Sequence, residues 1–365
     1  MRVVTIIGAR PQFVKAAVVS RELAASGIDE SLIHTGQHYD REMSAVFFEE
    51  LGIPEPAVNL DVGSGSHAEQ TGEIMVRLED FLLKHGGADL LMVYGDTNST
   101  IAGALVASKL LIPLAHVEAG LRSFNRRMPE EINRIVTDRL SDLLFCPTAT
   151  AVENLRLEGI EDGVHLTGDV MLDATLLFAD VADKQVDLEA LTGPDDAPYY
   201  VATVHRAENT DDPVRLRQIL EGLGRLDGPV VLPLHPRTRG RLDGVAVPGN
   251  IRLIEPVGYL AMLALVKRAR AVLTDSGGLQ KEALWLGVPC VTLRDETEWV
   301  ETLAGGWNQV VGADPDRIVE AVARRPRPPI PSISEPGAAR RIAEILKEWP
   351  KPSDGPHTRS ILAKS

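Results

Sequence analysis

Short apolar segments alternate with amphipathic ones along most of the chain, and this alternation constrains the fold more than any other feature. The first series of apolar segments comprises residues 2–8, 31–37, 88–96, 112–120 and 143–148. The second series comprises residues 198–205, 229–236, 251–257, 269–275 and 289–295. Helical patterns separate the members of each series, an order typical of βα units around a parallel sheet. The sequence therefore predicts an α/β protein with two doubly wound domains.

Length and composition agree with this division. A chain of 365 residues is long enough for two domains, and its 44% hydrophobic residues suffice for two cores. We expect an N-terminal domain over residues 1–170 and a C-terminal domain over 171–344. A proline-rich linker at 324–337 leads to one more amphipathic helix. We expect the last segment, about 345–365, to pack back on the first domain.

Several function classes are disfavoured by charge and composition. A formal net charge of −14 argues against a general role on nucleic acid or a membrane surface. No apolar run approaches the roughly 18 residues of a membrane span, and the N-terminus lacks a signal-peptide layout. Cys146 and Cys290 lie far apart, so two buried reduced thiols are expected. His34 and His38 have no evident third ligand. We expect a cytoplasmic protein without a metal site.

Acids, bases and glycines follow almost every predicted strand. Ligands of open α/β sheets bind beyond the carboxyl ends of the strands, so these loops are the first candidates for a site. They are Gly8–Pro11, Gly95–Thr97, His116–Gly120, His205–Asn209, His235–Arg237 and Asp275–Gly278. One or two such loops would be ordinary capping, whereas six across two domains indicate one shared cleft.

The segment Asp275-Ser276-Gly277-Gly278 stands where a predicted strand ends and a helix begins. Free N–H groups and the helix dipole favour an anion there, and two glycines let a phosphate approach closely. Ser276 can donate from its hydroxyl, and Glu282 can accept from ribose hydroxyls. The alternative is that Asp275 or Ser276 only caps the helix and Glu282 faces solvent. The chain has no P-loop and no G-x-G-x-x-G signature, so neither kinase chemistry nor standard dinucleotide binding is indicated.

Charged residues beside the first-domain strands are candidates for binding and proton transfer. Arg10 and Lys15 flank the first strand, and Pro11 fixes the turn, which favours anion binding over simple surface solvation. Asp96 and Glu118 each follow an apolar strand, so both are expected to be partly buried. Burial raises a carboxylate pKa and can bring it near neutrality, where the group serves as an acid or a base.

Other candidates have structural explanations of similar weight. Glu130 opens a predicted helix and Arg134 lies four residues on, so they suit either the site or a helix-surface ion pair, with Glu131 adding to the charge. His205 follows a second-domain strand and is either functional or a capping histidine. His235 is weaker, because the proline after it suggests a structural loop.

Nine stretches resemble the non-hydrolysing UDP-N-acetylglucosamine 2-epimerases, in that family's order. They are GARPQFVKA, TGQHYDREM, VYGDTNST, HVEAGLRS, MPEEINRIVTD, TGDVMLDA, VHRAEN, LTDSGGLQKEA and RDETEWVE, between residue 8 and about residue 301. The resemblance implies two Rossmann-like domains in a glycosyltransferase-B-like arrangement, with a UDP-sugar in the cleft between them. It also implies a homodimer of an isomerase that needs no metal or nicotinamide cofactor.

The resemblance further implies roles for individual residues. Those that match the family's UDP contacts are Arg10, His205, Arg206, Ser276, Gly277, Gly278 and Glu282. Those that match residues serving or surrounding the chemistry are Lys15, Asp96, Glu118, Glu130, Arg134 and His205. The implied reaction interconverts UDP-GlcNAc and UDP-ManNAc by anti elimination of UDP to 2-acetamidoglucal, followed by re-addition. Inversion at C2 removes a proton from one face and returns one to the other, so it needs at least two acids; which is the base stays open.

Two stretches depart from the main bacterial branch of that family. That branch has GTRPE where this chain has GARPQ, and a shorter segment where this chain has QHYDREM. Gln37, His38 and Arg41 are therefore not expected to form that branch's allosteric substrate site. The departures look more like a side branch that includes epimerases of UDP-2,3-diacetamido-glucuronic acid. A uronate would want an extra cation, which Arg126 or Arg127 can supply if they are not simply solvated.

Three other functions stay open at this point. A hydrolysing relative would release UDP and free N-acetylmannosamine. A glycosyltransferase of the same fold would need an acceptor and gives no reason for three acids at the strand ends. A sugar-nucleotide sensor would bind without turnover.

Overall fold

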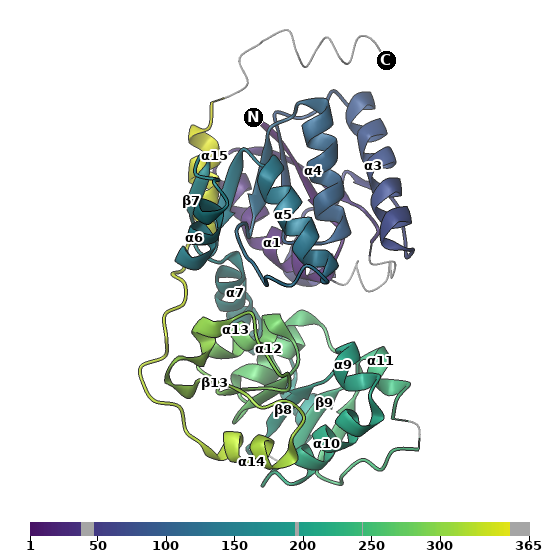
Figure 1. Cartoon of the computed structure of the whole chain (residues 1–365), viewed down its shortest axis with the longest axis vertical. Coiled ribbons are helices and arrows are strands. Elements are labelled where there is room, and N and C mark those ends of the chain that lie inside the picture. Colours follow the sequence, from purple (N-terminus) through teal and green to yellow (C-terminus); the bar gives the residue numbers. More distant parts are fainter. Residues whose placement is uncertain (38–46, 194–196, 243, 351–365) are drawn as a thin grey trace. The chain divides into compact units, whose positions relative to one another are not determined.

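The structure is a computed structural model that describes residues 1–37, 47–193, 197–242 and 244–350. The chain forms two compact units (Figure 1). Unit 1 comprises Met1–Ala174 and the returning segment from Ser334, and unit 2 comprises Thr175–Ile333. Each unit contains one parallel sheet with its own core.

The sheet of unit 1 has seven parallel strands in the order β3-β2-β1-β4-β5-β6-β7. Their bounds are Arg2–Ile7 (β1), Asp29–His34 (β2), Val58–Asn59 (β3), Leu90–Tyr94 (β4), Leu114–Val117 (β5), Leu143–Cys146 (β6) and Val164–Leu166 (β7). Every residue of β4, β5 and β6 is buried. This explains their continuous apolar sequence, because strands covered on both faces need no polar side.

The helices of unit 1 follow these strands. Their bounds are Arg10–Ala25 (α1), His67–Lys84 (α3), Asn98–Leu110 (α4), Pro129–Leu140 (α5), Ala149–Leu157 (α6), Val170–Gln185 (α7, which continues into unit 2) and Ala338–Glu348 (α15). The sequence analysis did not predict α3, although Ser66 and Glu69 form a capping box at its start.

The sheet of unit 2 has six parallel strands in the order β10-β9-β8-β11-β12-β13. Their bounds are Tyr200–Thr203 (β8), Val230–Pro233 (β9), Ile251–Ile254 (β10), Val272–Thr274 (β11), Cys290–Thr292 (β12) and Asn308–Val310 (β13). The helices are Leu188–Thr192 (α8), Ala207–Thr210 (α9), Pro213–Gly224 (α10), Pro236–Arg239 (α11), Tyr259–Lys267 (α12), Gly277–Trp285 (α13), Val300–Gly306 (η1, a 3-10 helix) and Pro315–Ala323 (α14).

Both sheets have the doubly wound strand order, which confirms the predicted fold class of two Rossmann-like domains. The order reverses between β1 and β4 in unit 1 and between β8 and β11 in unit 2. In such sheets ligands bind at the carboxyl ends of the strands beside this reversal. The loops after these four strands are therefore the places to look for a site.

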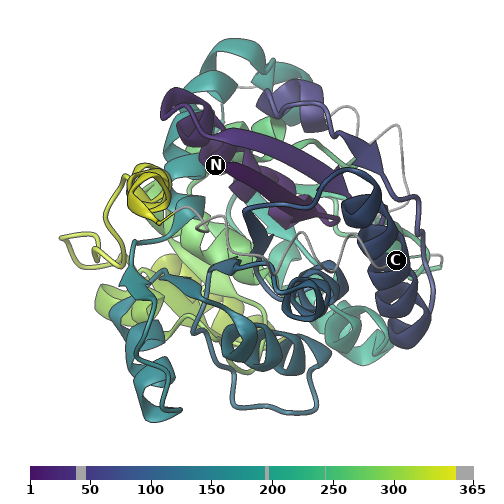
Figure 2. The same cartoon turned by 90° about the horizontal axis from the view of Figure 1, so that it is seen from above.

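The returning segment brings the whole of α15 into unit 1, where this helix packs on α1 (Figures 1 and 2). Its apolar face is buried, and Arg341 Nε donates to Thr167 O at 2.6 Å. The sequence analysis divided the domains at residues 344 and 345, which would cut this helix. The structural division lies at Ile333 and Ser334 instead, because the apolar face of α15 begins at Ala338.

Both cysteines are buried and unpaired, as predicted. Burial raises the pKa of the Cys146 and Cys290 thiols to about 12, so both stay protonated. Within the described residues, no helix has the length and apolar content required to cross a membrane.

Candidate active site

Unit 1 places two ion pairs at the carboxyl ends of β1, β4 and β5, and we call Lys15, Glu118, Asp96 and Arg134 the unit 1 cluster. Lys15 lies on α1 and is buried, and its ammonium pairs with the Glu118 carboxylate. Burial by itself lowers the pKa of Lys15, but the adjacent Glu118 outweighs it and the pKa is raised. Lys15 is therefore a fixed cation.

Glu118 follows β5 in an unusual backbone conformation, with a φ of +73°. Side chains other than glycine rarely adopt this left-handed region, and such residues cluster at functional sites. The carboxylate of this residue pairs with Lys15. This strain supports a functional role for Glu118.

Asp96 forms the second ion pair, with Arg134 from α5. Asn133 Nδ2 also donates to the Asp96 carbonyl at 2.8 Å, which fixes the loop after β4 on α5. Burial raises the pKa of the Asp96 carboxyl, and Arg134 opposes this rise only in part. The Asp96 side chain is 33% exposed, which confirms the predicted partial burial, and a carboxyl with a raised pKa is suited to proton transfer.

Gly95 brings the two ion pairs together. A Cβ atom at Gly95 would lie 3.3 Å from Glu118 Oε2 and 3.4 Å from Lys15 Nζ. Its φ of +60° also favours glycine. Asp96 follows directly, so the two carboxylates lie on neighbouring loops, each with its own cation.

Glu130 does not join these pairs in the structure. It lies in the first turn of α5 and is exposed. Within the described chain, Arg134 forms its ion pairs with Asp96 and with Glu131, so the helix-surface pair considered for Glu130 is absent. The role of Glu130 in the chemistry stays a proposal.

Arg10 begins α1 and is half-buried, and its guanidinium carbon lies 5.5 Å from the centre of the Phe47 ring. The loop before Arg10 is held by hydrogen bonds to the buried side chain of Gln12. Gln12 Oε1 accepts from Gly8 N at 2.8 Å, and Gln12 Nε2 donates to Tyr94 O at 2.8 Å. The glutamine of GARPQ thus ties the loop after β1 to the end of β4, and a carboxylate could not donate to that carbonyl.

A buried network lies beneath the unit 1 cluster, and the sequence analysis did not identify it. His116 has Nδ1 2.7 Å from Asp138 Oδ1 and Nε2 2.7 Å from Gly95 O. Arg122 Nη1 donates to Asp138 at 2.7 Å, and its Nε donates to Glu158 at 2.7 Å. Burial favours a raised pKa for Asp138, but His116 and Arg122 outweigh it and hold the pKa below its ordinary value.

Unit 2 is organised around Asp275, which is fully buried after β11. Its carboxylate accepts from His205 N and Arg206 N, each at 2.9 Å, and from Asn209 Nδ2 at 3.1 Å. Burial favours a raised pKa for Asp275, but the His205 side chain and these N–H groups hold it below the ordinary value. Asp275 therefore joins the loops after β8 and β11 and does not cap α13.

His205 is oriented by the same carboxylate, because its Nδ1 lies 3.0 Å from Asp275 Oδ1. The side chain is 35% exposed, so the rest of the ring is accessible. With Nδ1 engaged, Nε2 is the nitrogen that can meet a ligand. The ring lies 5.5 Å from that of His235, which caps α11 by accepting from Arg237 N at 3.2 Å. The structural interpretation of His235 is thus confirmed.

Ser276 and Glu282 of the α13 region differ in which of their two predicted interpretations the structure supports. Ser276 is the N-cap residue, and its hydroxyl accepts from Leu279 N at 3.5 Å, so the capping interpretation holds for Ser276. Glu282 is buried, so the alternative interpretation of a solvent-facing side chain is wrong.

The two glycines of α13 have different reasons to be glycine. A Cβ atom at Gly277 would lie 2.3 Å from Glu298 Oε1, so this position is needed for the neighbouring loop. Arg294 Nη1 donates to Glu298 at 2.7 Å, and it outweighs burial in lowering the pKa of Glu298. A Cβ atom at Gly278 would meet no atom within 4 Å. Open space at a helix start is what a phosphate would require.

The remaining predicted positions lie apart from these groups or outside the description. Gln37 Oε1 accepts from Ser99 Oγ at 2.7 Å, whereas His38 and Arg41 lie outside the described residues. Arg126 and Arg127 are exposed. Within the described ranges, no group of three or more His, Cys, Asp or Glu residues could hold a metal ion.

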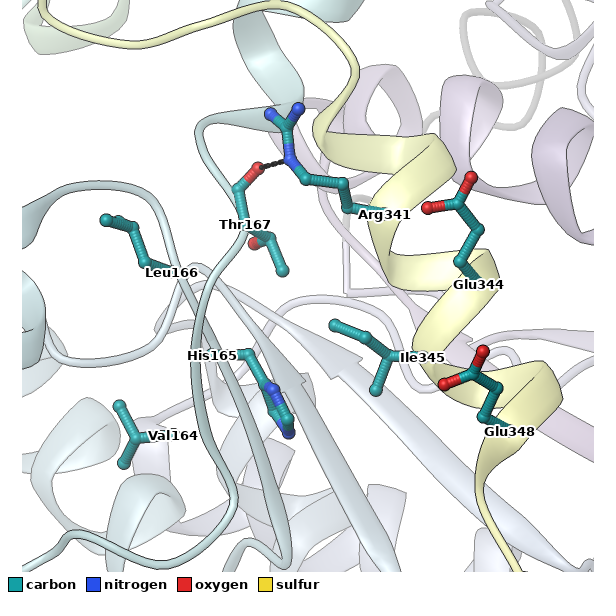
Figure 3. A pocket seen from close by; sticks show the side chains of 8 residues that line it. All are labelled: Val164, His165, Leu166, Thr167, Arg341, Glu344, Ile345 and Glu348. Atoms are coloured by element: carbon teal, nitrogen blue, oxygen red, sulfur yellow. Dashed lines mark hydrogen bonds between the residues drawn. The ribbon is translucent and has the colours of Figure 1, made fainter.

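A separate cavity of about 460 Å³ opens between β7 and α15 in unit 1 (Figure 3). Its lining consists of Val164, His165, Leu166, Thr167, Arg341, Glu344, Ile345 and Glu348. None of these residues was predicted for the site. The cavity therefore does not coincide with the candidate active site.

Two Rossmann-like units with these residues at their strand ends define a class of enzymes that act on nucleotide-linked substrates. The family model for UDP-N-acetylglucosamine 2-epimerase matches residues 21–347. The chain belongs to the UDP-N-acetylglucosamine 2-epimerase family, which confirms the resemblance seen in the sequence.

Relatives extend over nearly the whole chain. The UDP-2,3-diacetamido-2,3-dideoxy-D-glucuronate 2-epimerase of Pseudomonas aeruginosa is 53% identical, with 88% of this chain and 91% of the relative covered. The UDP-N-acetylglucosamine 2-epimerase of Methanocaldococcus jannaschii is 46% identical, with 88% and 91% covered. A crystal structure described as the latter enzyme with UDP-GlcNAc and UDP has a TM-score of 0.86 at 44% identity, covering 95% of this chain and 100% of that one.

Proposed function

We propose that the protein is a non-hydrolysing UDP-sugar 2-epimerase that interconverts UDP-GlcNAc and UDP-ManNAc. The observation that carries the proposal is the presence of two carboxylates, Asp96 and Glu118, on neighbouring loops with separate cations. Inversion at C2 requires proton transfer on both faces of the sugar, and two independently held acids meet this requirement. The family membership supplies the UDP-sugar class of the substrate.

The proposed reaction proceeds by elimination and re-addition. One carboxylate removes the C2 proton, the C1–O bond to the β-phosphate breaks, and the C1=C2 bond of the glycal forms. A second acid then returns a proton to the opposite face of C2, while the phosphate oxygen re-forms its bond to C1. Arg10, His205 and the start of α13 are proposed to stabilise the charge on departing UDP. Exclusion of bulk water from the site would retain UDP and the glycal.

The test is proton NMR of the protein with UDP-GlcNAc in D₂O. The expected result is UDP-ManNAc with deuterium at C2. Free N-acetylmannosamine together with UDP would identify a hydrolysing enzyme instead. Turnover that occurs only with a sugar acceptor would identify a glycosyltransferase. Binding of UDP-GlcNAc without any conversion would identify a sugar-nucleotide sensor.

A second substrate, UDP-2,3-diacetamido-glucuronate, is favoured by the 53% identity to the P. aeruginosa enzyme. Its carboxylate would need a cation. Arg126 and Arg127 come between Glu118 and Arg134 in the sequence, and neither has an ion-pair partner in the described part of the chain. This substrate would be offered in the same NMR experiment.

Replacing both Arg126 and Arg127 with Ala is expected to lower kcat/KM for the uronate by about tenfold or more, since a charged hydrogen bond is lost. UDP-GlcNAc has no carboxylate, so its kcat/KM should fall much less. Steady-state assays with both substrates measure the ratio. Equal losses for the two sugars would rule out carboxylate recognition by these arginines.

The glycine pair offers a matched test of UDP binding. Gly277→Ala should lower the melting temperature, because its Cβ would clash with Glu298. Gly278→Ala should leave the melting temperature unchanged, because open space surrounds that position. If the phosphates bind there, Gly278→Ala should weaken UDP binding by about tenfold, as calorimetry would measure. Unchanged UDP affinity in Gly278→Ala would place the phosphates elsewhere.

From the family resemblance we also propose a cytoplasmic homodimer that serves polysaccharide biosynthesis. Light scattering after gel filtration tests the dimer, with a mass of about twice 39.6 kDa expected. A mass of one chain would contradict it.

A further inference from the structure

Glu131 is a buried carboxylate of α5 that the proposed reaction does not use. Its side chain is almost fully inaccessible, in contrast to the exposed Glu130 beside it. Glu131 Oε1 accepts from Phe124 N at 2.9 Å. Glu131 Oε2 accepts from the backbone N and the hydroxyl of Ser123, both at 2.9 Å. The carboxylate therefore braces the loop that precedes α5.

The same carboxylate contacts the unit 1 cluster through Arg134. Glu131 Oε2 accepts from Arg134 Nη1 at 3.1 Å, while Arg134 Nη2 donates to Asp96. A guanidinium is rigid and planar, so the direction of one donor fixes the direction of the other. Arg134 thus spans two carboxylates, one buried and one in the proposed site.

We propose that Glu131 is a positioning residue, which holds Arg134 as a counter-ion shared with Asp96. In this arrangement one edge of the guanidinium serves Glu131 and the other serves Asp96. Asp96 consequently receives only part of the charge of Arg134 and keeps the proton affinity that burial gives it. The kinetic consequence of this arrangement rests on the proposed epimerase function, whereas the titration of Asp96 does not.

A purely structural role must be separated from this one, because Glu131 also braces its loop. Phe124 has a φ of +58° and is 78% exposed, so its loop holds a strained conformation beside the Glu131 contacts. Ser123→Ala removes two hydrogen bonds within the loop, the one that Ser123 Oγ donates to Glu131 and the one that it accepts from Asn125 N, and leaves the Arg134 side chain unchanged. This variant is the matched control.

The experiment follows the titration of Asp96 by NMR of protein with ¹³C-labelled aspartate carboxyl groups, with Asp96→Asn for assignment. In Glu131→Gln the full charge of Arg134 falls to Asp96, so the pKa of Asp96 should drop by about one unit. The other charged groups that face Asp96 are Glu118 after β5 and Lys15 on α1, and they are unchanged. Ser123→Ala should leave the midpoint where it is.

A double-mutant comparison tests whether Glu131 acts on Asp96 through Arg134. In Arg134→Lys the two-pronged guanidinium is lost, so adding Glu131→Gln should cause little further change in the titration midpoint of Asp96. A midpoint that stays constant or rises in Glu131→Gln would reduce Glu131 to a loop brace and overturn the proposal. If Glu131→Gln does not fold, Glu131→Asp replaces it, and a smaller fall in the same direction is expected, because the shorter side chain withdraws from Arg134 but keeps its negative charge.

Kinetics then relate the titration to the reaction. Glu131→Gln should lower kcat by about tenfold with KM nearly unchanged, because substrate contacts remain while Asp96 becomes a weaker proton carrier. Wild-type protein that turns over neither sugar would contradict the proposed function. The titration of Asp96 would still decide the role of Glu131 in that case.

Discussion

Asp96→Asn is expected to lower kcat for epimerisation by about a hundredfold to ten-thousandfold, the range typical of a lost proton-transfer group. The amide keeps the size of the side chain but cannot take or return a proton. Glu118→Gln should cause a loss of the same order, since the second face of the sugar then lacks its acid. Coupled assays of UDP-ManNAc formation and of deuterium entry at C2 measure both.

Binding of UDP provides the control for these two variants. The proposed UDP contacts other than Arg10 belong to unit 2, whereas Asp96 and Glu118 belong to unit 1 and are not among those contacts, so calorimetry should give UDP affinities within about threefold of the wild type. Circular dichroism checks the fold of each variant. Full activity in both variants would refute the mechanism, and loss of UDP binding would show that the substitutions act on more than the chemistry.

Asp138→Asn is expected to lower the free energy of unfolding by about 3–5 kcal/mol, because it removes the buried carboxylate that His116 and Arg122 share and leaves Arg122 only the partly exposed Glu158. Glu158→Gln is the matched control at the other end of the same guanidinium. The Glu158 side chain is 31% exposed, so its loss should cost about 1 kcal/mol or less. Urea unfolding of the two variants measures the difference. Equal losses of unfolding free energy would show that Asp138 contributes no more to stability than Glu158.

The pH dependence of this difference has a definite sign. The pKa of Asp138 is held below its ordinary value in the folded protein. Its carboxylate therefore contributes stability that is present above about pH 4 and is lost as the pH falls through the lowered pKa. The stability gap between wild type and Asp138→Asn should narrow in acid. A gap that stays constant with pH would mean that the ionised carboxylate is not the source of the stability.

Local patterns in the sequence were sufficient for the fold class. Buried parallel strands such as β4 and β6 are continuous apolar runs, and a run of this kind is recognisable without knowledge of its neighbours. The raised pKa of Asp96 also followed from its place after such a strand. Helix α3 was not predicted, although the capping box of Ser66 and Glu69 at its start can be recognised in the sequence.

The sequence patterns did not predict which residues the charged side chains contact. The spacing of Glu130 and Arg134 satisfied the rule for a helical ion pair, yet Arg134 pairs with Asp96, 38 positions away. Gly277 was interpreted through a phosphate, whereas its immediate neighbour is the Glu298 carboxylate. In both cases the contacting carboxylate lies in a segment that is distant along the chain.

The sequence alone therefore determined the two doubly wound domains, the family and the loops that carry the candidate residues, because these depend on periodicity and on motifs along the chain. Only the tertiary structure decided that Lys15 holds Glu118, that Asp138 joins His116 to Arg122, and that Glu131 shares Arg134 with Asp96. The physical reason is that an ion pair depends on distance in space, and parallel strands bring together at one sheet edge residues that are far apart along the chain.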